Sequence, residues 1–286
     1  MKAVPWVAFA LAAVAWTSVG CGGCKLEPPS AGPTAAPMEN PYGLGRAMSL
    51  HVALGVPYDR DGSDDELLVK RQYVLSYNPH RNEANWVAWN LNAGDYGAVK
   101  RYRGKFLPDE SLPASVRRIH HEDYTGSGYD RGHMVRSEER TATVEDNLAT
   151  FLLGNILPQT HELNAGPWLA LEEECRTLAQ RGRKELFLVA GGISGNSGQT
   201  IGSGVLVPEA FFKVIVVLER GQSAVDVTPR TRVIAARFPN VHEGLAADWT
   251  AYRVTVDELE RATGYELLSD VVPAVQQIVE ATVDDG

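Results

Sequence analysis

The sequence predicts a mixed α+β domain with a largely antiparallel sheet and inserted helices. Short apolar segments typical of strands come in neighbouring pairs, and segments typical of helices lie between the pairs. Strands that follow each other closely along a chain usually pair antiparallel, so these local pairs favour an antiparallel sheet. The chain has 286 residues, of which 44% are hydrophobic, and this is enough for one substantial core.

The predicted strands are residues 73–77, 86–91, 185–190, 211–218 and 232–236. A polar turn separates the first two strands, and the pair Gly191-Gly192 is expected to end the third. The predicted helices begin at residues 144, 167 and 254. Pro167 suits the first turn of the second helix, and Gly264 is expected to stop the third. The acidic segment 59–66 is predicted to be a solvated turn.

The composition excludes several classes of protein. The hydrophobic content excludes a disordered chain, and 27 glycines and 16 prolines without a period exclude collagen. Three cysteines are too few for a disulfide-built scaffold. The formal net charge of −9 argues against a nucleic-acid partner, because proteins that bind phosphate backbones are usually basic. Any phosphate-binding groups must therefore form a local cluster.

The first residues are typical of an export signal. Residues 1–20 carry one Lys and then an Ala-rich apolar run that is short for a bilayer span. Small residues before Cys21 resemble a bacterial lipobox, in which the Cys is lipidated. The alternative is cleavage near Gly20 or Gly23, which would release a soluble protein. The predicted parts are a signal at 1–20, a Pro-rich flexible tether at 21–45, a single domain at 46–275 and an acidic tail at 276–286.

This arrangement predicts an exported protein that is lipid-anchored in a bacterial cell envelope, in the periplasm or at the outer membrane. A Pro-rich tether is what a folded domain on a lipid anchor requires, because such a composition cannot bury a core. Cleavage without lipidation would instead predict a secreted protein. In the lipidated form the membrane would be a partner through Cys21.

Two segments carry residues suited to chemistry on phosphate. In Asp130-Arg131-Gly132-His133 the histidine is a proton acceptor with a pKa near neutrality, and Gly132 is expected to permit a turn. Downstream, Asn164 lies near the start of the second predicted helix, and Glu172 and Arg176 lie one turn apart on one face. Neutral and anionic oxygens suit Mg²⁺, and a guanidinium binds phosphate.

These segments identify a family. The motifs are Asp130-Arg131-Gly132-His133, Asn155-Ile156-Leu157-Pro158-Gln159 and the run from Leu163-Asn164 to Leu171-Glu172. In this order and spacing the chain resembles the DNA/RNA non-specific endonucleases, the endonuclease G-like members of the ββα-metal superfamily. The likeness extends over about residues 50 to 270, so the fold it implies is an α+β domain that carries a ββα-metal nuclease site.

The resemblance implies a metal-dependent, sequence-non-specific endonuclease that cuts DNA and RNA, single- or double-stranded. His133 would be the general base that takes a proton from the attacking water. Asn164 would be the direct protein ligand of Mg²⁺, with Mn²⁺ as a substitute, and Glu172 would order the waters around it. The products would carry 5′-phosphate and 3′-hydroxyl ends. The sequence does not indicate a protein inhibitor.

The resemblance also implies roles for other residues. Arg131 and Arg176 would bind phosphate, and Asn155 would help to position the site. The family uses a further Arg before the motif, for which Arg103 is favoured over Arg101. Asp130 and Gly132 would be structural. The residues expected to contact substrate more widely are Arg101, Lys105, Arg136 and Arg140.

The sequence leaves several hypotheses open. The chain is alternatively a catalytically inactive lipoprotein on the same fold that binds nucleic acid or a partner protein, or a phosphodiesterase for another substrate. Asn164 also suits a helix N-cap, and Glu172 with Arg176 suits a plain surface ion pair. The cysteines Cys24 and Cys175 would be able to pair in an oxidising compartment. A zinc cluster is the last hypothesis, formed by His120, His121, His133 and His161.

Overall fold

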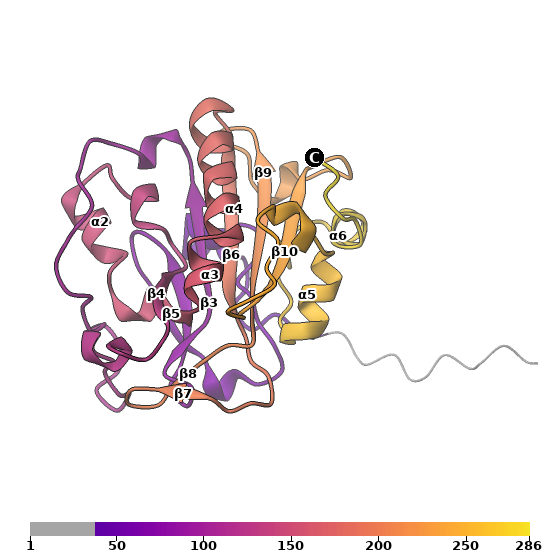
Figure 1. The fold of residues 1–286 in the computed structure, drawn as a ribbon. Helices are drawn as coiled ribbons and strands as arrows, with labels where there is room; N and C mark the ends of the chain where they lie inside the picture. The colour runs from indigo at the N-terminus through magenta and orange to yellow at the C-terminus, as the bar shows by residue number, and fades with distance from the viewer. Residues whose placement is uncertain (1–37) are drawn as a thin grey trace, which may run out of the picture. The chain divides into compact units, whose positions relative to one another are not determined.

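A six-stranded antiparallel sheet forms the centre of the computed structural model, which describes residues 38–286 (Figure 1). The strand order is β1-β2-β3-β6-β9-β10, and each neighbouring pair is antiparallel. The strands are β1 Glu66–Val69, β2 Val74–Asn78, β3 Glu83–Leu91, β6 Glu185–Ile193, β9 Ala210–Leu218 and β10 Val233–Pro239. The signal sequence, Cys21 and most of the tether lie outside the described residues.

Helices and two small two-stranded sheets complete the fold. The helices are α1 Gly45–Met48, α2 Val144–Ala149, α3 His161–Asn164, α4 Pro167–Arg176, α5 Val256–Thr263 and α6 Pro273–Glu280. The small sheets pair β4 (Asp130–His133) with β5 (Ile156–Gln159) and β7 (Thr200–Ile201) with β8 (Val205–Leu206), each antiparallel. The predicted α+β class with a largely antiparallel sheet is therefore confirmed. No helix in residues 38–286 is long and apolar enough to cross a membrane.

The sheet separates two hydrophobic cores. Side chains alternate along β9, so that Phe212, Val214 and Val216 belong to one core while Phe211 and Ile215 belong to the other. Helices α5 and α6 contribute to the first core, and α4 lies over the sheet and contributes to the second (Figure 1). Because the central strands are covered on both faces, their sequences are nearly continuous apolar runs.

The sheet differs from its prediction at two places. Strand β6 continues through Gly191 and Gly192, which were expected to end it. A Cβ at Gly191 would lie 2.4 Å from the backbone oxygen of Asn85, so glycine permits the close approach of β3. Strand β1 was not predicted, and its first residue, Glu66, was assigned to the acidic turn. It is a short edge strand whose residues are mostly half-buried, which leaves a weak pattern.

The C-terminal segment differs from the predicted acidic tail. Helix α6 crosses the expected boundary at residue 275, and Val279 is buried in the first core. Further along, the Asp284 carboxylate pairs with Arg232 at 2.8 Å and with Arg253 at 3.3 Å. These ion pairs and the buried valine attach residues 276–286 to the domain, so the acidic composition of this segment was a poor guide to its structure.

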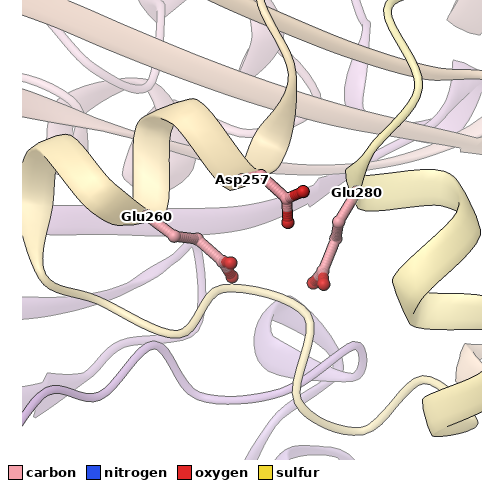
Figure 2. A group of neighbouring side chains, drawn as sticks. All are labelled: Asp257, Glu260 and Glu280. Carbon is pink, nitrogen blue, oxygen red and sulfur yellow. The ribbon is translucent and has the colours of Figure 1, made fainter. Parts of the chain in front are cut away.

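Three carboxyl groups, of Asp257, Glu260 and Glu280, meet between α5 and α6 (Figure 2). Their oxygens lie within 4.8 Å of one another. Burial, together with neighbouring carboxylates, raises the pKa of Glu260 to about 7 and that of Glu280 to about 8. These groups therefore bind protons more tightly in the folded chain than in the unfolded chain, where the pKa is near 4.5. The contribution of Glu260 and Glu280 to the free energy of unfolding therefore falls as the pH rises from about 4.5 through about 8.

We expect the thermal unfolding temperature to fall by a few degrees as the pH is raised from about 6 to about 9 at constant salt. Glu280→Gln removes one of the titrating groups and should flatten this dependence, whereas Glu243→Gln at an exposed site should leave it unchanged. Differential scanning fluorimetry across this range measures the effect. Parallel curves for wild type and Glu280→Gln would contradict the prediction.

Candidate active site

The antiparallel pair of strands β4 and β5 positions the Asp130-Arg131-Gly132-His133 motif. His133 is opposite Ile156 and Gly132 is opposite Leu157, so the motif is a strand and not the expected turn. Alternate residues of a strand share a face, which places Arg131 and His133 on the same side. Gly132 is needed for a different reason, since a Cβ there would lie 2.5 Å from the side-chain oxygen of Gln159.

A polar cavity of about 270 Å³ lies beside β4. The residues that line this cavity come from β4, from the end of α3, from α4 and from loops on both sides of β4. Its lining consists of Arg101, Arg131, His133, Arg136, Glu138, Asn164, Ala165, Leu169 and Glu172. The predicted base, metal ligand and carboxylate, His133, Asn164 and Glu172, are therefore brought together in one place.

His133 lies in an apolar and cationic environment. Its ring centroid is 5.3 Å from that of Phe106 and 5.1 Å from that of Phe151. The Nε2 atom is buried and has no hydrogen-bond partner among residues 38–286. Burial, and then the charges of Arg101 and Arg136, lower the pKa of His133 to about 3. The imidazole is therefore neutral at ordinary pH and is able to accept a proton.

Asn155 fixes the chain immediately after His133. Its amide is fully buried and makes a two-way contact with Val135, accepting from the backbone N–H at 2.9 Å and donating to the carbonyl at 3.0 Å. The same amide donates to the Thr150 carbonyl at 2.9 Å. These bonds connect the end of β4 to the segment before β5. Asn155 therefore stabilises the backbone next to His133 and does not itself line the cavity.

Asp130 orients the side chain of Asn164. The Asn164 amide nitrogen donates to Asp130 Oδ2 at 2.9 Å, and the same oxygen contacts His161 Nδ1 at 2.9 Å. With the nitrogen engaged, the carbonyl Oδ1 of Asn164 is the remaining acceptor of that side chain. Asn164 is the last residue of α3, and Gly166 is the N-cap of α4, so the N-cap hypothesis for Asn164 is wrong. Asp130 is thus a structural partner of Asn164.

Glu172 is a buried carboxylate between two cations. Its Oε2 lies 3.5 Å from Arg136 Nε, and its Oε1 lies 3.8 Å from Lys213 Nζ. Burial raises the pKa of Glu172, and both cations oppose that rise. Arg136 lines the cavity as expected, but it also pairs with Glu138 and with Glu173. The surface-pair hypothesis required Glu172 to pair with Arg176. The two residues do not pair, because the Glu172 carboxylate faces inward.

The predicted cations separate into groups. Arg101 and Arg131 line the cavity, whereas Arg103 and Lys105 are exposed and do not. The structure thus places Arg101, and not the favoured Arg103, in the lining of the cavity that holds His133. Lys105 instead pairs with Glu122 at 2.5 Å. Arg176 lies outside this cavity and lines a second one of about 230 Å³, where its Nε donates to Gln180 at 3.1 Å.

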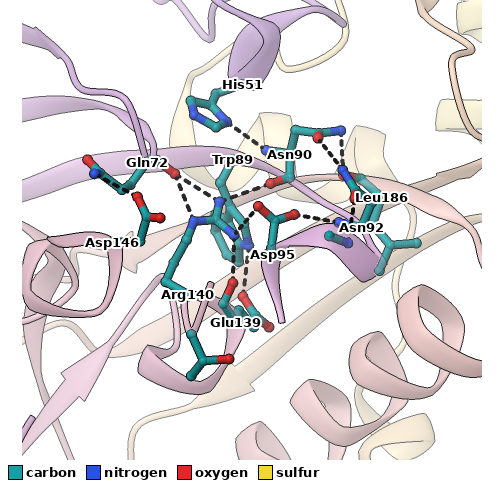
Figure 3. A network of polar contacts seen from close by, with 12 residues as sticks. His51, Gln72, Trp89, Asn90, Asn92, Asp95, Glu139, Arg140, Asp146 and Leu186 are labelled. Atoms are coloured by element: carbon teal, nitrogen blue, oxygen red, sulfur yellow. Dashed lines mark hydrogen bonds and ion pairs between the residues drawn. The ribbon is translucent and has the colours of Figure 1, made fainter. Parts of the chain in front are cut away.

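Arg140 is a structural residue, which corrects its assignment to substrate binding. Its side chain is 3% exposed and lies among backbone carbonyls (Figure 3). The guanidinium donates to the carbonyls of Gln72 at 2.8 Å, Asn90 at 2.9 Å and Glu139 at 2.9 Å. It also lies 3.7 Å from Asp95. These contacts connect the segment after β4 to the central sheet, so this charge is unavailable to phosphate.

We expect Arg140→Met to lower the free energy of unfolding by about 3 kcal/mol or more, because several buried acceptors would lose their donor. Arg103→Met removes the same charge at an exposed site and should change stability by less than about 0.5 kcal/mol. Urea denaturation of both variants measures the difference. Equal stability of the two variants would show that the Arg140 network contributes little.

The structure bears on the zinc-cluster and disulfide hypotheses. Within residues 38–286, the group of side chains able to hold a metal by mutual distance is Asp257, Glu260 and Glu280, so the histidines do not form a zinc cluster. Cys175 is a buried free thiol whose pKa burial raises. Its hypothetical disulfide partner, Cys24, lies outside the described residues.

Some residues of the site were not predicted. Glu138, Ala165 and Leu169 line the cavity, and Lys213 lies behind Glu172. Lys213 could have been recognised from the sequence, because it is a charged residue in the middle of the apolar run 211–218. A charge inside a doubly covered strand requires an internal partner. The three lining residues left no comparable pattern.

Comparison with known proteins identifies the family. The sequence profile of the DNA/RNA non-specific endonucleases matches residues 56–274. The chain belongs to the DNA/RNA non-specific endonuclease family. A relative named nuclease from Nostoc sp. is 45% identical over 247 residues, covering 85% of this chain and 89% of that protein. Human mitochondrial endonuclease G is 31% identical over 218 residues, which cover 72% of this chain and 71% of the relative.

A solved structure supports the fold of this endonuclease. The crystal structure of the EndoG/EndoGI complex matches with a TM-score of 0.66 at 24% identity, covering 84% of this chain and 95% of that chain. At this identity the match supports the fold alone. The family match confirms the resemblance seen in the sequence, and it makes the protein a non-specific endonuclease whose substrates are nucleic acids.

Proposed function

We propose that this endonuclease hydrolyses phosphodiester bonds of DNA and RNA in the cavity beside β4, with a divalent metal ion, leaving 5′-phosphate and 3′-hydroxyl ends. The observation that carries the proposal is that His133, Asn164 and Glu172 line one cavity although they come from different elements. A proton acceptor, an amide oxygen and a carboxylate are the groups that metal-assisted hydrolysis requires.

His133 is the general base in this proposal. Its low pKa keeps the imidazole unprotonated before substrate binds. An approaching phosphate anion favours the protonated ring, so the basicity of His133 rises when the scissile group enters the cavity. The imidazole then removes a proton from the attacking water, and Asn155 keeps the strand end that carries it in place.

The residues present fit a hard divalent cation such as Mg²⁺, with Mn²⁺ as a substitute. Asn164 would hold the ion through Oδ1, because its amide nitrogen is bound to Asp130. Glu172 would order waters around the ion with its carboxylate. When bound, the metal supplies positive charge that stabilises the developing charge on the phosphate and the leaving 3′ oxygen.

Arg101 and Arg131 are the proposed phosphate-binding groups, in place of Arg103 and Arg140. The Arg131 guanidinium is held by the His121 carbonyl at 2.7 Å and Thr125 Oγ1 at 3.0 Å, which fixes its position in the cavity. These charges act locally on a chain with a net charge of −9. We therefore propose binding that is weakened strongly by salt.

We also propose that the protein is exported and lipid-anchored through Cys21 in a bacterial cell envelope. The support is the apolar run with small residues before Cys21 and the Pro-rich segment after it. In this arrangement the tether would place the endonuclease domain away from the membrane surface, where it meets nucleic acid.

A plasmid-nicking assay tests the proposal. Wild-type protein with Mg²⁺ should convert supercoiled plasmid to nicked and linear forms and should degrade single-stranded RNA. An excess of EDTA should abolish both reactions, and added Mg²⁺ or Mn²⁺ should restore them. Cleavage that persists in EDTA would reject metal dependence. No cleavage with any divalent metal would favour an inactive protein that only binds nucleic acid.

A further inference from the structure

We propose that Lys213 is a positioning residue for Glu172, supplying from the protein interior the positive charge that fixes this carboxylate at the cavity. The proposal rests on the proposed function of Glu172. Lys213 comes from the middle of β9, on the face of the sheet that α4 covers. It is not among the residues that line the cavity.

The environment of Lys213 is unusual for a lysine. The side chain is 1% exposed, and its ammonium is buried with no hydrogen-bond partner among residues 38–286. The ammonium lies 3.9 Å from the ring centroid of Trp168 and 5.7 Å from that of Trp89. Aromatic faces compensate a cation in part, but burying an ammonium remains costly without a carboxylate.

Glu172 is the carboxylate that compensates Lys213. Its Oε1 is 3.8 Å from Lys213 Nζ, and among the described residues this is the ion pair that Lys213 makes. The other oxygen, Oε2, lies 3.5 Å from Arg136 Nε. Lys213 thus holds one oxygen from the side of the sheet, while Arg136 holds the other from the cavity side. Two fixed cations on different oxygens restrict rotation of the carboxylate.

A second buried carboxyl group, that of Glu139, also lies within the electrostatic reach of Lys213. Glu139 Oε2 accepts a hydrogen bond from Trp89 Nε1 at 2.9 Å, and burial raises the pKa of Glu139 to about 7 although the charge of Lys213 opposes that rise. Arg136 is shared among several carboxylates. Its terminal nitrogens lie 2.5 Å from Glu138 Oε2 and 2.6 Å from Glu173 Oε1. Among the described residues, Glu172 is therefore the carboxylate that forms an ion pair with Lys213, whereas Glu139 is affected by the charge of Lys213 without such a pair.

A double-mutant cycle tests the proposal, using Lys213→Met, Glu172→Gln and the double variant. Met matches the length of the lysine stem without its charge. We expect Lys213→Met to lower kcat about 10- to 100-fold, with little change in KM for DNA because Lys213 does not reach the substrate. In the Glu172→Gln background the same change should lower kcat by less than about 2-fold, because a neutral amide needs no counter-charge. Lys184→Met, which removes a lysine paired with Glu219, is the matched control and should leave kcat unchanged.

Thermal unfolding of the same variants provides a readout that does not depend on activity. Lys213→Met should lower the unfolding temperature more in the wild-type background than with Glu172→Gln, because only the former leaves a buried carboxylate without its partner. If Lys213→Met alone does not fold, a folded double variant supports the pair, and an unfolded double variant overturns it.

The outcomes separate this proposal from the proposed function. Equal kcat losses from Lys213→Met in both backgrounds, or no loss at all, overturn the positioning role while wild type remains an active endonuclease. A raised KM with unchanged kcat also overturns it, since that pattern indicates substrate contact. An inactive wild type, by contrast, rejects the proposed function itself, and the unfolding cycle then reports whether the ion pair exists.

Discussion

Replacing His133 with alanine should lower kcat for plasmid cleavage by about 10²- to 10⁴-fold, the usual contribution of a general base. The buried ring packs against Phe106 and Phe151 and lines the same cavity as Asn164. Removing it takes away the proposed proton acceptor while the arginines and the carboxylate remain. KM should change far less than kcat, because the lost interaction belongs to the transition state.

Two measurements make this result specific. His80→Ala, at an exposed turn residue, is the matched control and should cleave at the wild-type rate. Circular dichroism of both variants checks that the fold is retained. Cleavage by His133→Ala within about 3-fold of wild type would show that another group accepts the proton, whereas a loss beyond about 10²-fold would support the assignment.

The pH dependence of the cleavage rate provides a further test of His133 as the general base. The pKa of His133 is lowered to about 3 in the protein without substrate, so the base is already unprotonated at pH 5. The acid limb of kcat/KM, which reports the free enzyme, should therefore not reflect a histidine near pH 6.5. The anionic substrate favours the imidazolium, so the acid limb of kcat should lie at a higher pH than that of kcat/KM.

The sheet could be predicted from the sequence because burial on both faces leaves a strong signal. Strand β9 is apolar at every position except Lys213, β6 is apolar after Glu185, and β3 contains a shorter apolar run at residues 86–89. The edge strand β1 has no such signal, since its residues are mostly half-buried. The glycines of β6 were misinterpreted because close approach of Asn85, and not the end of the strand, explains Gly191.

The central site residues could be predicted because the motifs carry them in a fixed order. The environment of each individual arginine could not be predicted. An arginine buried among carbonyls and an arginine that faces a cavity are the same residue type in a sequence. Arg140 bonds to Gln72 and Asn90, which are distant in sequence. Glu172 and Arg176 have the spacing of a helical pair, but Arg136 in the cavity lining and Lys213 in the interior hold the carboxylate away from Arg176.

Replacing Asn164 with alanine should remove the proposed metal ligand. We expect kcat at a fixed, moderate Mg²⁺ concentration to fall by at least about 10²-fold and the Mg²⁺ concentration for half-maximal activity to rise. Isothermal titration of Mg²⁺ into the protein without substrate should show the same loss of affinity. The unfolding temperature should change little, because Asn164 is only partly buried at the end of a short helix.

An exchange of side chains distinguishes the ligand role from a purely structural one. Asn164→Asp keeps an oxygen ligand but places a carboxylate beside Asp130, where the amide now donates at 2.9 Å. This single variant should bind Mg²⁺ weakly, because like charges force the two groups apart. Adding Asp130→Asn restores a donor and an acceptor in swapped positions and should recover part of the Mg²⁺ affinity. Wild-type Mg²⁺ dependence in Asn164→Ala would contradict the ligand assignment, and the same affinity for the single and the exchanged variants would contradict the orienting role of Asp130.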